Sequence, residues 1–236
     1  MIDVDLLVVG GGINGAGLAR DAAGRGLSVC LVEQDDLAAH TSSASTKLIH
    51  GGLRYLEHHE LRLAGTPLGE PLLPSMQTGF EYSDCWVDDA RLVVLNAKDA
   101  AERGARILPR TRLIAARREG PVWLAQCEER HLGSRFELRA RALVNATGAW
   151  AGALHGSLTG SETAAESLRR VKGSHLVFPR LYEGDHAYLL QSADRRVVFA
   201  IPYEERFTLV GTTDVPFEGD PSRVEVDDAE VEYLCS

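Results

Sequence analysis

The sequence predicts an α/β fold in which a parallel-sheet domain comes first and a smaller, mainly antiparallel α+β domain follows. The first observation is a strand, a glycine-rich turn, a helix and a second strand within the opening 33 residues. The second is a set of alternating apolar segments after residue 170, which is typical of antiparallel strands. The chain has 236 residues, 44% of them hydrophobic, which is enough for a core in each domain.

The opening segment has the order of a Rossmann-like unit. An apolar run at 4–9 leads into a glycine-rich turn at 10–15, and a helix is expected over 13–25. A second apolar run at 28–32 ends on an acid. The free N–H groups and partial positive charge at a helix N-terminus favour phosphate. Because the glycine pattern lies between two strand signals, it predicts a dinucleotide site more strongly than a lone glycine pattern would.

Five residues of this unit have distinct expected roles. Gly10 permits the tight turn, Gly12 lets a pyrophosphate approach the backbone, and Gly15 lets the helix pack close to the strand. Glu33 lies at the end of the second strand, eighteen residues after Gly15, where a carboxylate can bind the adenosine ribose hydroxyls. Asn14 either donates to a phosphate or caps the helix; both roles stay open.

The segment that follows indicates which kind of dinucleotide the site binds. Its sequence at 41–55 is Thr-Ser-Ser-Ala-Ser-Thr-Lys-Leu-Ile-His-Gly-Gly-Leu-Arg-Tyr. A nicotinamide domain would continue into further regular strand–helix units at this point. Here small hydroxyl residues, a lysine, a histidine and a glycine pair follow instead. Such a stretch suits close packing against a flat ring system and an anion.

On these residues the chain resembles the FAD-dependent glycerol-3-phosphate dehydrogenases, respiratory enzymes of bacteria and mitochondria. The similar segments run in order along almost the whole chain: 5–17, 41–57, 79–92, 144–150, 172–175 and 211–214. The resemblance implies FAD as cofactor and oxidation of sn-glycerol 3-phosphate to dihydroxyacetone phosphate. It also implies that hydride passes to flavin N5 and that the electrons reach a membrane quinone.

The resemblance also assigns cofactor contacts to the glycine turn, the hydroxyl-rich loop and the turn after the last strand of the first domain. These residues are Gly10, Gly12, Asn14, Gly15, Glu33, Ser42, Ser43, Ser45, Lys47, Gly51, Gly52, Thr147 and Gly148. Without the resemblance, the serine-rich loop would indicate only a solvated loop held by its own side-chain hydrogen bonds.

Three residues are the candidates for the catalytic and substrate site. His50 either takes the substrate hydroxyl proton or only hydrogen-bonds backbone or flavin. Arg54 either binds the substrate phosphate with two parallel hydrogen bonds or pairs with Glu57 or His58 on a helix surface. Tyr55 can bond the phosphate or a substrate hydroxyl.

Weaker candidates lie in the second domain, where substrate-side residues are expected. They are Lys172, His175 and residues 212–214. Trp86 and Trp150 are expected in the core. The spacing of His, Cys and Asp along the chain indicates no metal site.

We expect residues 1–167 to form the FAD-binding domain and residues 168–236 a partial substrate domain. A β-meander at about 105–140 is inserted in the first domain. A proline- and glycine-rich link at 64–78 stands where the family usually has several tens of residues more. The pattern at 226–234 predicts the opening of a helix, so we expect a truncated chain.

The remaining elements are expected from local patterns. We expect a short helix at 36–44, a turn followed by a helix within 46–62, and a connection between domains at 152–167. The helix at 88–104 should be capped by Asp88 or Asp89 and stopped by Gly104. The predicted strands are 105–108, 112–118, 122–128 and 135–139 in the meander, 142–144 as the last strand of the first domain, and 170–179, 188–191, 197–203 and 207–211 in the second domain.

Composition limits the partners. The net charge of −9 argues against nucleic acid, which needs clustered basic residues. The four cysteines are scattered, as expected of reduced thiols in a cytoplasmic protein. No apolar run has the length of a membrane span. By resemblance the protein is peripheral on the inner face of the cytoplasmic membrane, with the bilayer surface and quinone as partners, and a homodimer stays open.

Two alternatives stay open for the activity. One is a related FAD oxidase that passes electrons to oxygen and acts on a glycerophosphate, an amine or a hydroxy acid. The other is a catalytically incomplete fragment that binds FAD or nothing, which the expected truncation and the short link would favour.

Overall fold

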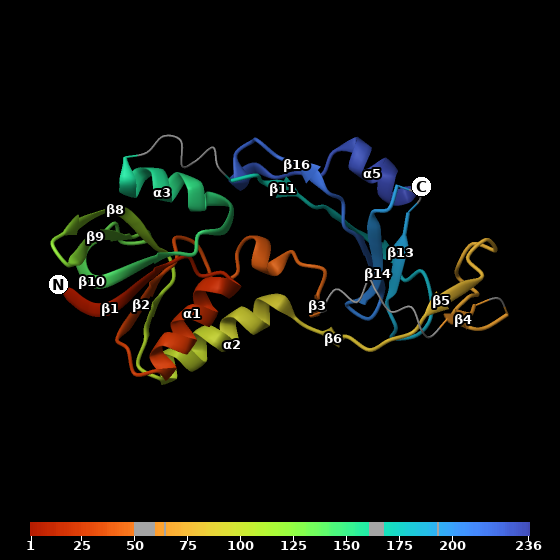
Figure 1. The fold of residues 1–236 in the computed structure, drawn as a ribbon, viewed down its shortest axis with the longest axis horizontal. Coiled ribbons are helices and arrows are strands. Elements are labelled where there is room, and N and C mark those ends of the chain that lie inside the picture. Colours follow the sequence, from red (N-terminus) through yellow and green to blue (C-terminus); the bar gives the residue numbers. More distant parts are fainter. Residues whose placement is uncertain (50–59, 64, 161–167, 193) are drawn as a thin grey trace. The chain divides into compact units, whose positions relative to one another are not determined.

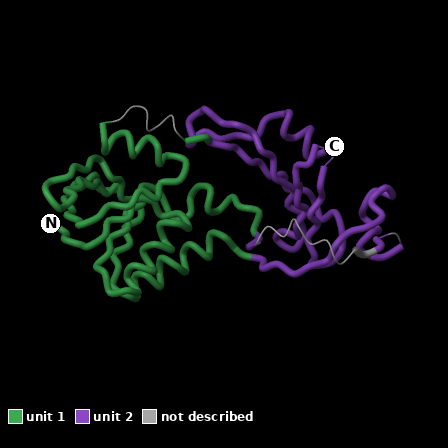
Figure 2. Tube along the Cα trace, viewed as in Figure 1, with its two compact units in different colours: residues 1–47, 87–169 green, residues 48–86, 170–236 purple. Residues whose placement is uncertain are grey.

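The chain forms two compact units in a computed structural model. The model describes residues 1–49, 60–63, 65–160, 168–192 and 194–236. Unit 1 comprises residues 1–47 and 87–169, and unit 2 comprises residues 48–86 and 170–236 (Figure 2). The segment 48–86, which the sequence assigned to the first domain, therefore packs with the second. One contact that holds it there is a 2.8 Å hydrogen bond from the Tyr188 hydroxyl to the Leu68 carbonyl oxygen.

A six-stranded sheet with the order β7-β2-β1-β10-β9-β8 forms the centre of unit 1. Its strands are β1 (Ile2–Val9), β2 (Val29–Val32), β7 (Arg106–Leu108), β8 (Thr111–Glu119), β9 (Val122–Glu129) and β10 (Arg135–Asn145). Strands β7, β2, β1 and β10 are parallel neighbours, and β10, β9 and β8 are antiparallel neighbours. This order confirms the predicted Rossmann-like α/β fold.

Two strand predictions in this sheet are wrong. The segment 105–108 was expected in the meander, but β7 pairs in parallel with β2 instead. The segments 135–139 and 142–144 were expected as separate strands, but they form the single strand β10. The alternation explains the continuity: Leu138 and Ala140 are buried whereas Arg139 and Arg141 are exposed, so the arginines continue the strand period rather than break it.

Helices cover both faces of this sheet (Figure 1). On one face, α1 (Ile13–Gly24) and α2 (Asp89–Glu102) lie side by side, and an apolar cluster there includes Ala19, Leu31 and Ala100. On the other face, α3 (Ala151–Thr159) packs beside the meander, where Leu154 contacts a second cluster. The sheet is thus buried on both sides, as a parallel sheet requires.

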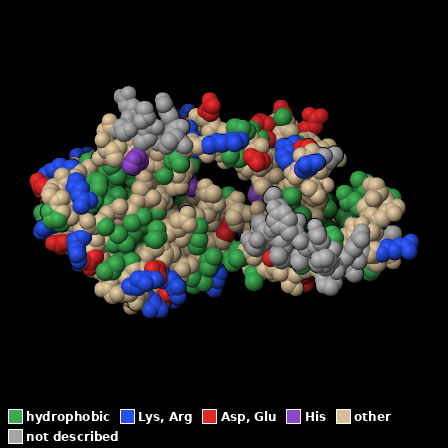
Figure 3. Space-filling model, viewed as in Figure 1, with side chains coloured by type: hydrophobic (Ala, Val, Ile, Leu, Met, Phe, Trp, Pro, Cys, Tyr) green, Lys and Arg blue, Asp and Glu red, His purple; other side chains and the backbone are tan. Residues whose placement is uncertain are grey.

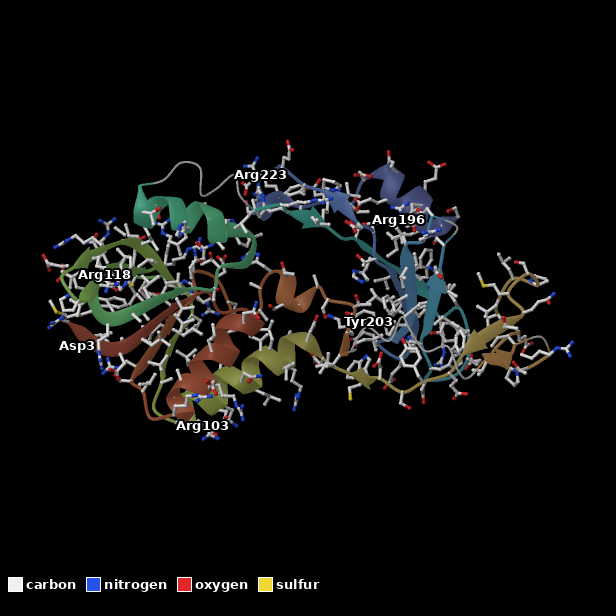
Figure 4. All side chains as sticks on the ribbon, viewed as in Figure 1. Asp3, Arg103, Arg118, Arg196, Tyr203 and Arg223 are labelled. Carbon is white, nitrogen blue, oxygen red and sulfur yellow. The ribbon has the colours of Figure 1, made fainter. Side chains whose placement is uncertain are left out.

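Helix α2 begins as predicted. The Asp88 side chain accepts a hydrogen bond of 3.0 Å from the Arg91 N–H, which satisfies one of the free donors of the first turn. At the other end, the Asp99 carboxylate accepts from Arg103 at 3.0 Å and from Arg20 of α1 at 2.5 Å (Figure 4 labels Arg103). Asp99 therefore links the two helices.

Two helix predictions are wrong, and one expected connection contains a helix. The segment 36–44 contains only a 3-10 turn, Thr41–Ser43. Residues 60–62, expected in a helix, form strand β4 (Glu60–Arg62), which pairs with β5 (Thr78–Phe80). The expected connection at 152–167 begins instead with α3, which Gly160 ends in the left-handed conformation at φ 70°. The small residues of this segment are compatible with a helix, but their composition is more typical of a connection.

Unit 2 is built on an antiparallel sheet, as predicted, and its strand order is β12-β15-β14-β13. The segment 170–179, expected as one strand, forms two: β11 pairs with β16 in a separate ribbon, and β12 pairs with β15. Its elements are β3 (Leu48–Ile49), β6 (Cys85–Trp86), β11 (Val171–Lys172), β12 (His175–Pro179), β13 (Tyr188–Gln191), β14 (Val197–Tyr203), β15 (Phe207–Gly211), β16 (Val215–Pro216), a 3-10 turn (Pro221–Arg223) and α5 (Asp228–Cys235), besides β4 and β5. A capping box between Asp227 and Glu230 starts α5.

Trp86 lies at the surface rather than in the core. It is 62% exposed, so the expectation that it lies in the core is wrong.

Two of the cysteines, Cys30 and Cys127, are buried in unit 1. Burial raises the pKa of Cys30 to about 12 and of Cys127 to about 11. Basic and acidic side chains are intermixed on the face that Figure 3 shows. Within the described ranges, no helix combines the length and the apolar character needed to cross a bilayer.

Candidate dinucleotide-binding site

The glycine turn lies at the carboxyl edge of the parallel strands in unit 1. It leaves β1 after Val9 and enters α1. The Gly10 N–H donates to the Val32 carbonyl oxygen at 2.9 Å, and the Ala146 N–H donates to the Val9 carbonyl oxygen at 2.8 Å. Backbone bonds to both neighbouring strands therefore fix the turn, at the edge where α/β sheets bind ligands.

Two glycines of this turn occupy positions that a side chain could not share. Gly10 has φ +113°, and a Cβ there would lie 2.4 Å from the Ala146 carbonyl oxygen. A Cβ on Gly15 would lie 1.8 Å from the Gly10 carbonyl oxygen. The turn and α1 can pack this closely only because both positions lack a side chain.

The Glu33 carboxylate lies directly beside the turn. Its Oε2 accepts a hydrogen bond of 2.6 Å from the Gly11 N–H, and its Oε1 accepts one of 2.8 Å from the Asp35 N–H. Glu33 is only 9% exposed. Each carboxylate oxygen has a further lone pair, so the side chain can still accept hydrogen bonds from a ligand's hydroxyl groups.

A cavity of about 430 Å³ opens in front of the turn and the Glu33 carboxylate. Its lining comes from the glycine turn, the end of β2, the loop that follows, the start of β8, and the segment after β10. The lining residues are Val9, Gly10, Gly12, Ile13, Asn14, Val32, Glu33, Gln34, Ala38, Ala39, His40, Thr41, Ser42, Thr111, Arg112, Leu113, Ala146, Thr147, Gly148, Ala149, Trp150, Ala153 and Leu154.

Seven of the predicted cofactor residues line this cavity together: Gly10, Gly12, Asn14, Glu33, Ser42, Thr147 and Gly148. Gly15 lies beneath the turn and allows its packing. The Ser42 hydroxyl accepts a 3.0 Å hydrogen bond from the Ile13 N–H, so it satisfies the first free donor of α1. A Cβ on Gly12 would lie 3.0 Å from the Ser42 oxygen. The loop and the helix start therefore form one surface.

Ser45 and Lys47 have a different partner. The Asp89 carboxylate accepts from Lys47 Nζ at 2.6 Å and from the Ser45 hydroxyl at 2.7 Å. Burial opposes ionisation of Asp89, but these hydrogen bonds outweigh it and lower the pKa of the carboxyl. Both side chains thus tie the hydroxyl-rich loop to the start of α2. Ser43 is similarly turned to the backbone, and its hydroxyl donates to the His40 carbonyl oxygen at 3.0 Å.

The segment after β10 is shaped by Asn145. The Thr147 hydroxyl donates to Asn145 Oδ1 at 2.7 Å, and Asn145 Nδ2 donates to the Ala151 carbonyl oxygen at 2.8 Å. These two bonds hold the turn through Gly148 against the start of α3. Asn145 therefore supports the part of the cavity wall that Thr147 contributes.

Sequence reasoning missed two aromatic residues of the wall. Trp150 was expected in the core, but it lines the cavity, so that expectation is wrong. His40 lines it as well and lies close to Asp35, with 3.0 Å between Nε2 and Oδ2. The proximity of Trp150 to Thr147 and Gly148 in the sequence was a usable signal, whereas no local pattern indicated His40.

The three candidates for the catalytic site and the glycine pair at 51–52 lie outside the described part of the chain. These are His50, Gly51, Gly52, Arg54 and Tyr55. In the described parts, no group of three or more His, Cys, Asp and Glu side chains is arranged to hold a metal ion.

Lys172 and its surroundings form a separate polar cluster in unit 2. The buried Glu230 carboxylate accepts from Lys172 Nζ at 2.7 Å, from the Thr213 hydroxyl at 2.6 Å and from the Ser174 hydroxyl at 2.9 Å. Burial disfavours the charged carboxylate, yet the bonds from Lys172 and Thr213 outweigh burial and lower the pKa of Glu230. Hydrogen bonds from Lys172 to Glu230 and Asp227 raise the pKa of the ammonium group.

The sheet order, the glycine turn and the acid after β2 define unit 1 as a Rossmann-like dinucleotide-binding protein. The family described as FAD dependent oxidoreductase matches residues 5–70 and 63–236. The chain belongs to this family, whose cofactor is FAD. The cavity fits such a group. The glycine turn that lines it has no room for side chains, so its backbone can face a pyrophosphate, and the Glu33 carboxylate lies beside it.

Named relatives are more specific. A glycerol-3-phosphate dehydrogenase of Pseudomonas aeruginosa is 46% identical over 290 aligned positions, which cover 98% of this chain and 56% of the relative. A D-erythritol 1-phosphate dehydrogenase of Brucella abortus is 42% identical, with 98% and 58% covered. The chain spans a little over half the length of these relatives. These identities confirm the resemblance inferred from the sequence.

A solved structure agrees with this placement. The glycerol-3-phosphate dehydrogenase from Bacillus halodurans, determined in complex with FAD, matches with a TM-score of 0.81 and 30% identity. The match covers 98% of this chain and 51% of that chain.

Proposed function

We propose that this chain binds FAD in the cavity of unit 1 and serves the oxidation of sn-glycerol 3-phosphate to dihydroxyacetone phosphate. The observation that supports FAD binding most directly is the contact between the glycine turn and the Glu33 carboxylate at the mouth of this cavity. The substrate is proposed from the named relatives, which act on phosphorylated polyols.

Different residues of the described part bind different parts of the cofactor. The backbone at Gly12 and the N-terminus of α1 hold the pyrophosphate, where free N–H groups and the helix dipole favour negative charge. Glu33 accepts hydrogen bonds from the adenosine ribose. Thr147 and Gly148, which follow β10 and line the same cavity, form a second contact. When bound, FAD supplies the acceptor for the hydride that leaves substrate C2.

Three residues outside the described part of the chain are proposed to contact the substrate. Arg54 binds the phosphate bidentately and Tyr55 orients it. His50 takes the proton of the C2 hydroxyl group as hydride leaves, so that a carbonyl group forms. The chain's own contribution to the reaction is therefore positioning, charge and proton transfer.

We extend the proposal to the electron acceptor and to the location of the protein. A quinone in the membrane receives the electrons, and the protein lies on the inner face of the cytoplasmic membrane without spanning it. The proposal includes a homodimer, which size measurements in solution would test. Oxygen uptake with peroxide release would instead identify an oxidase.

A second substrate is favoured by one finding. The D-erythritol 1-phosphate dehydrogenase is nearly as similar to this chain as the glycerol-3-phosphate dehydrogenase. The two substrates share a phosphate and a neighbouring polyol, so an arginine-based site can accept either, and the room beyond the reacting carbon decides between them.

The test is anaerobic mixing of the flavin-loaded protein with each polyol phosphate while the visible flavin absorbance is followed. We expect bleaching with sn-glycerol 3-phosphate and slower or no bleaching with D-erythritol 1-phosphate. Faster bleaching with D-erythritol 1-phosphate would identify that compound as the substrate instead. Bound flavin that neither compound bleaches would leave FAD binding intact and contradict the oxidation. Failure to bind FAD would contradict the whole proposal.

A further inference from the structure

One wall of the cavity in unit 1 is aromatic. His40 and Trp150 both line it, and their ring centroids are 4.7 Å apart with an angle of 58° between the planes. His40 lies just before the 3-10 turn Thr41–Ser43, and Trp150 ends the 3-10 turn Gly148–Trp150 that precedes α3. Two loops from opposite sides of the glycine turn therefore meet at this wall.

Polar contacts fix the imidazole of His40. Its Nε2 lies 3.0 Å from Asp35 Oδ2, and the other oxygen of Asp35 pairs with the Arg130 guanidinium. Arg130 also donates to the Gln34 carbonyl oxygen at 3.1 Å. The Asp35 N–H in turn donates to Glu33 Oε1 at 2.8 Å. The aromatic wall is thus anchored to the backbone that carries the ribose-binding acid.

We propose that Trp150, held in place by His40, is the platform on which the adenine of the bound dinucleotide stacks. Glu33 is placed to bind the adenosine ribose, and the base is joined directly to that sugar. A flat ring with a polarisable face is the usual partner of an unpaired base. Leu113 and Leu154 line the same cavity and supply apolar contact around it.

In this arrangement Asp35 and His40 are positioning residues. They contact the platform rather than the ligand, because the imidazole bridges the Asp35 carboxylate and the Trp150 ring. The inference rests on the FAD-binding part of the proposed function and is independent of the substrate. It can therefore be tested with ligands that carry the adenine but no reacting group.

The first test compares binding of FAD and of ADP to the apoprotein. For Trp150→Leu, we expect the dissociation constants of both ligands to rise by the same factor, about tenfold, since stacking of one base is lost. Trp150→Phe keeps a flat ring and should restore most of the affinity. The matched control is Trp123→Leu on β9, whose ring faces Arg118 at 5.8 Å rather than the cavity (Figure 4 labels Arg118).

The positioning role has its own control. Asp35→Asn weakens the hold on His40 and should raise the dissociation constant of ADP by a smaller factor, about threefold, as expected of a lost charge-assisted hydrogen bond. Asp36→Asn changes the neighbouring carboxylate, which pairs with exposed Arg110 at 3.4 Å, and should leave ADP binding unchanged. Equal effects of both substitutions would contradict a specific role for Asp35.

A spectroscopic measurement keeps the proposal testable if Trp150→Leu folds poorly. In the variant Trp86→Phe/Trp123→Phe, Trp150 is the sole tryptophan, and saturation with ADP should quench or shift its emission. Unchanged emission at saturating ADP would overturn the platform. So would a Trp150→Leu variant in which FAD binding weakens while ADP binding does not, because the ring would then contact the flavin half.

Discussion

The Gly11 N–H donates a 2.6 Å hydrogen bond to Glu33 Oε2, and this bond joins the glycine turn to the end of β2. The turn that faces the pyrophosphate and the acid that faces the ribose are therefore one structural unit. A Cβ on Gly11 would lie 2.8 Å from the Glu33 Cβ, so the contact also fills the space between the two segments. Changes at Glu33 should act on stability and on cofactor binding together.

Glu33→Gln tests this coupling. The amide has one acceptor oxygen but faces two backbone donors, Gly11 and Asp35, so one donor is left without its acceptor. Such a loss costs about 1–3 kcal/mol in the free energy of unfolding. We expect that decrease in urea unfolding and a rise of at least about tenfold in the dissociation constant of FAD, equal to about 1.4 kcal/mol. A variant that loses stability but binds FAD normally would show that Glu33 does not contact the ribose.

Gly15→Ala should disrupt the turn. The new methyl group would lie 1.8 Å from the Gly10 carbonyl oxygen, so α1 must move away from β1. Overpacking of this kind costs about 1–3 kcal/mol, and we expect FAD binding to fall below detection. The control is Gly17→Ala in the same helix, where nothing lies within 4 Å of the new group. It should stabilise α1 by about 0.5–1 kcal/mol through helix propensity and bind FAD normally.

Asp89 should make the stability of unit 1 depend on acid. Its folded pKa is lowered, so its contribution is present above the unfolded value of about 3.9 and is lost as pH falls through the folded value. We expect the unfolding free energy of the wild-type protein to decrease between pH 7 and about pH 3 more than that of Asp89→Asn. If both proteins lose stability in parallel, the contacts of Asp89 with Lys47 and Ser45 do not contribute in solution.

The cluster around Glu230 should behave as a coupled unit. Lys172→Met leaves the buried Glu230 carboxylate without its counter-charge, and Glu230→Gln removes one of the two carboxylates with which Lys172 pairs, so each substitution should lower the urea midpoint of unfolding. The double variant should be more stable than the sum of the single effects predicts, because the buried Glu230 charge that Lys172→Met leaves unpaired is then absent. Additive effects in this double-mutant cycle would contradict the coupling.

Local patterns predicted the elements around the cofactor but not the contacts between them. The glycine turn, α1, α2 and the cap at Asp88 follow from spacing within a few residues. The partner of Ser45 and Lys47 does not, because Asp89 lies 44 residues beyond Ser45 and an acid at a helix start has many possible roles. The same holds for Glu230, whose contact with Ser174 joins residues 56 apart.

The predictions are wrong at positions where residue composition indicates one structure and tertiary packing selects another. Residues 152–159 are small and polar enough to indicate a connection, but packing of Leu154 against the sheet selects a helix. The segments 135–139 and 142–144 form one strand because β10 pairs with β9 over its first part and with β1 over most of its length, contacts that no local pattern contains. Trp150 was assigned to the core by residue type alone, although a tryptophan directly after a ligand-binding turn can equally face the ligand.

The cavity of unit 1 is proposed to hold one FAD. The most direct measurement is titration of the apoprotein with FAD, following the quenching of flavin fluorescence, for the wild type, Gly15→Ala and Gly17→Ala. We expect saturation at one FAD per chain for the wild type and Gly17→Ala, and no saturable binding for Gly15→Ala. Wild-type protein that is folded but binds no FAD, or equal binding by Gly15→Ala, would contradict it.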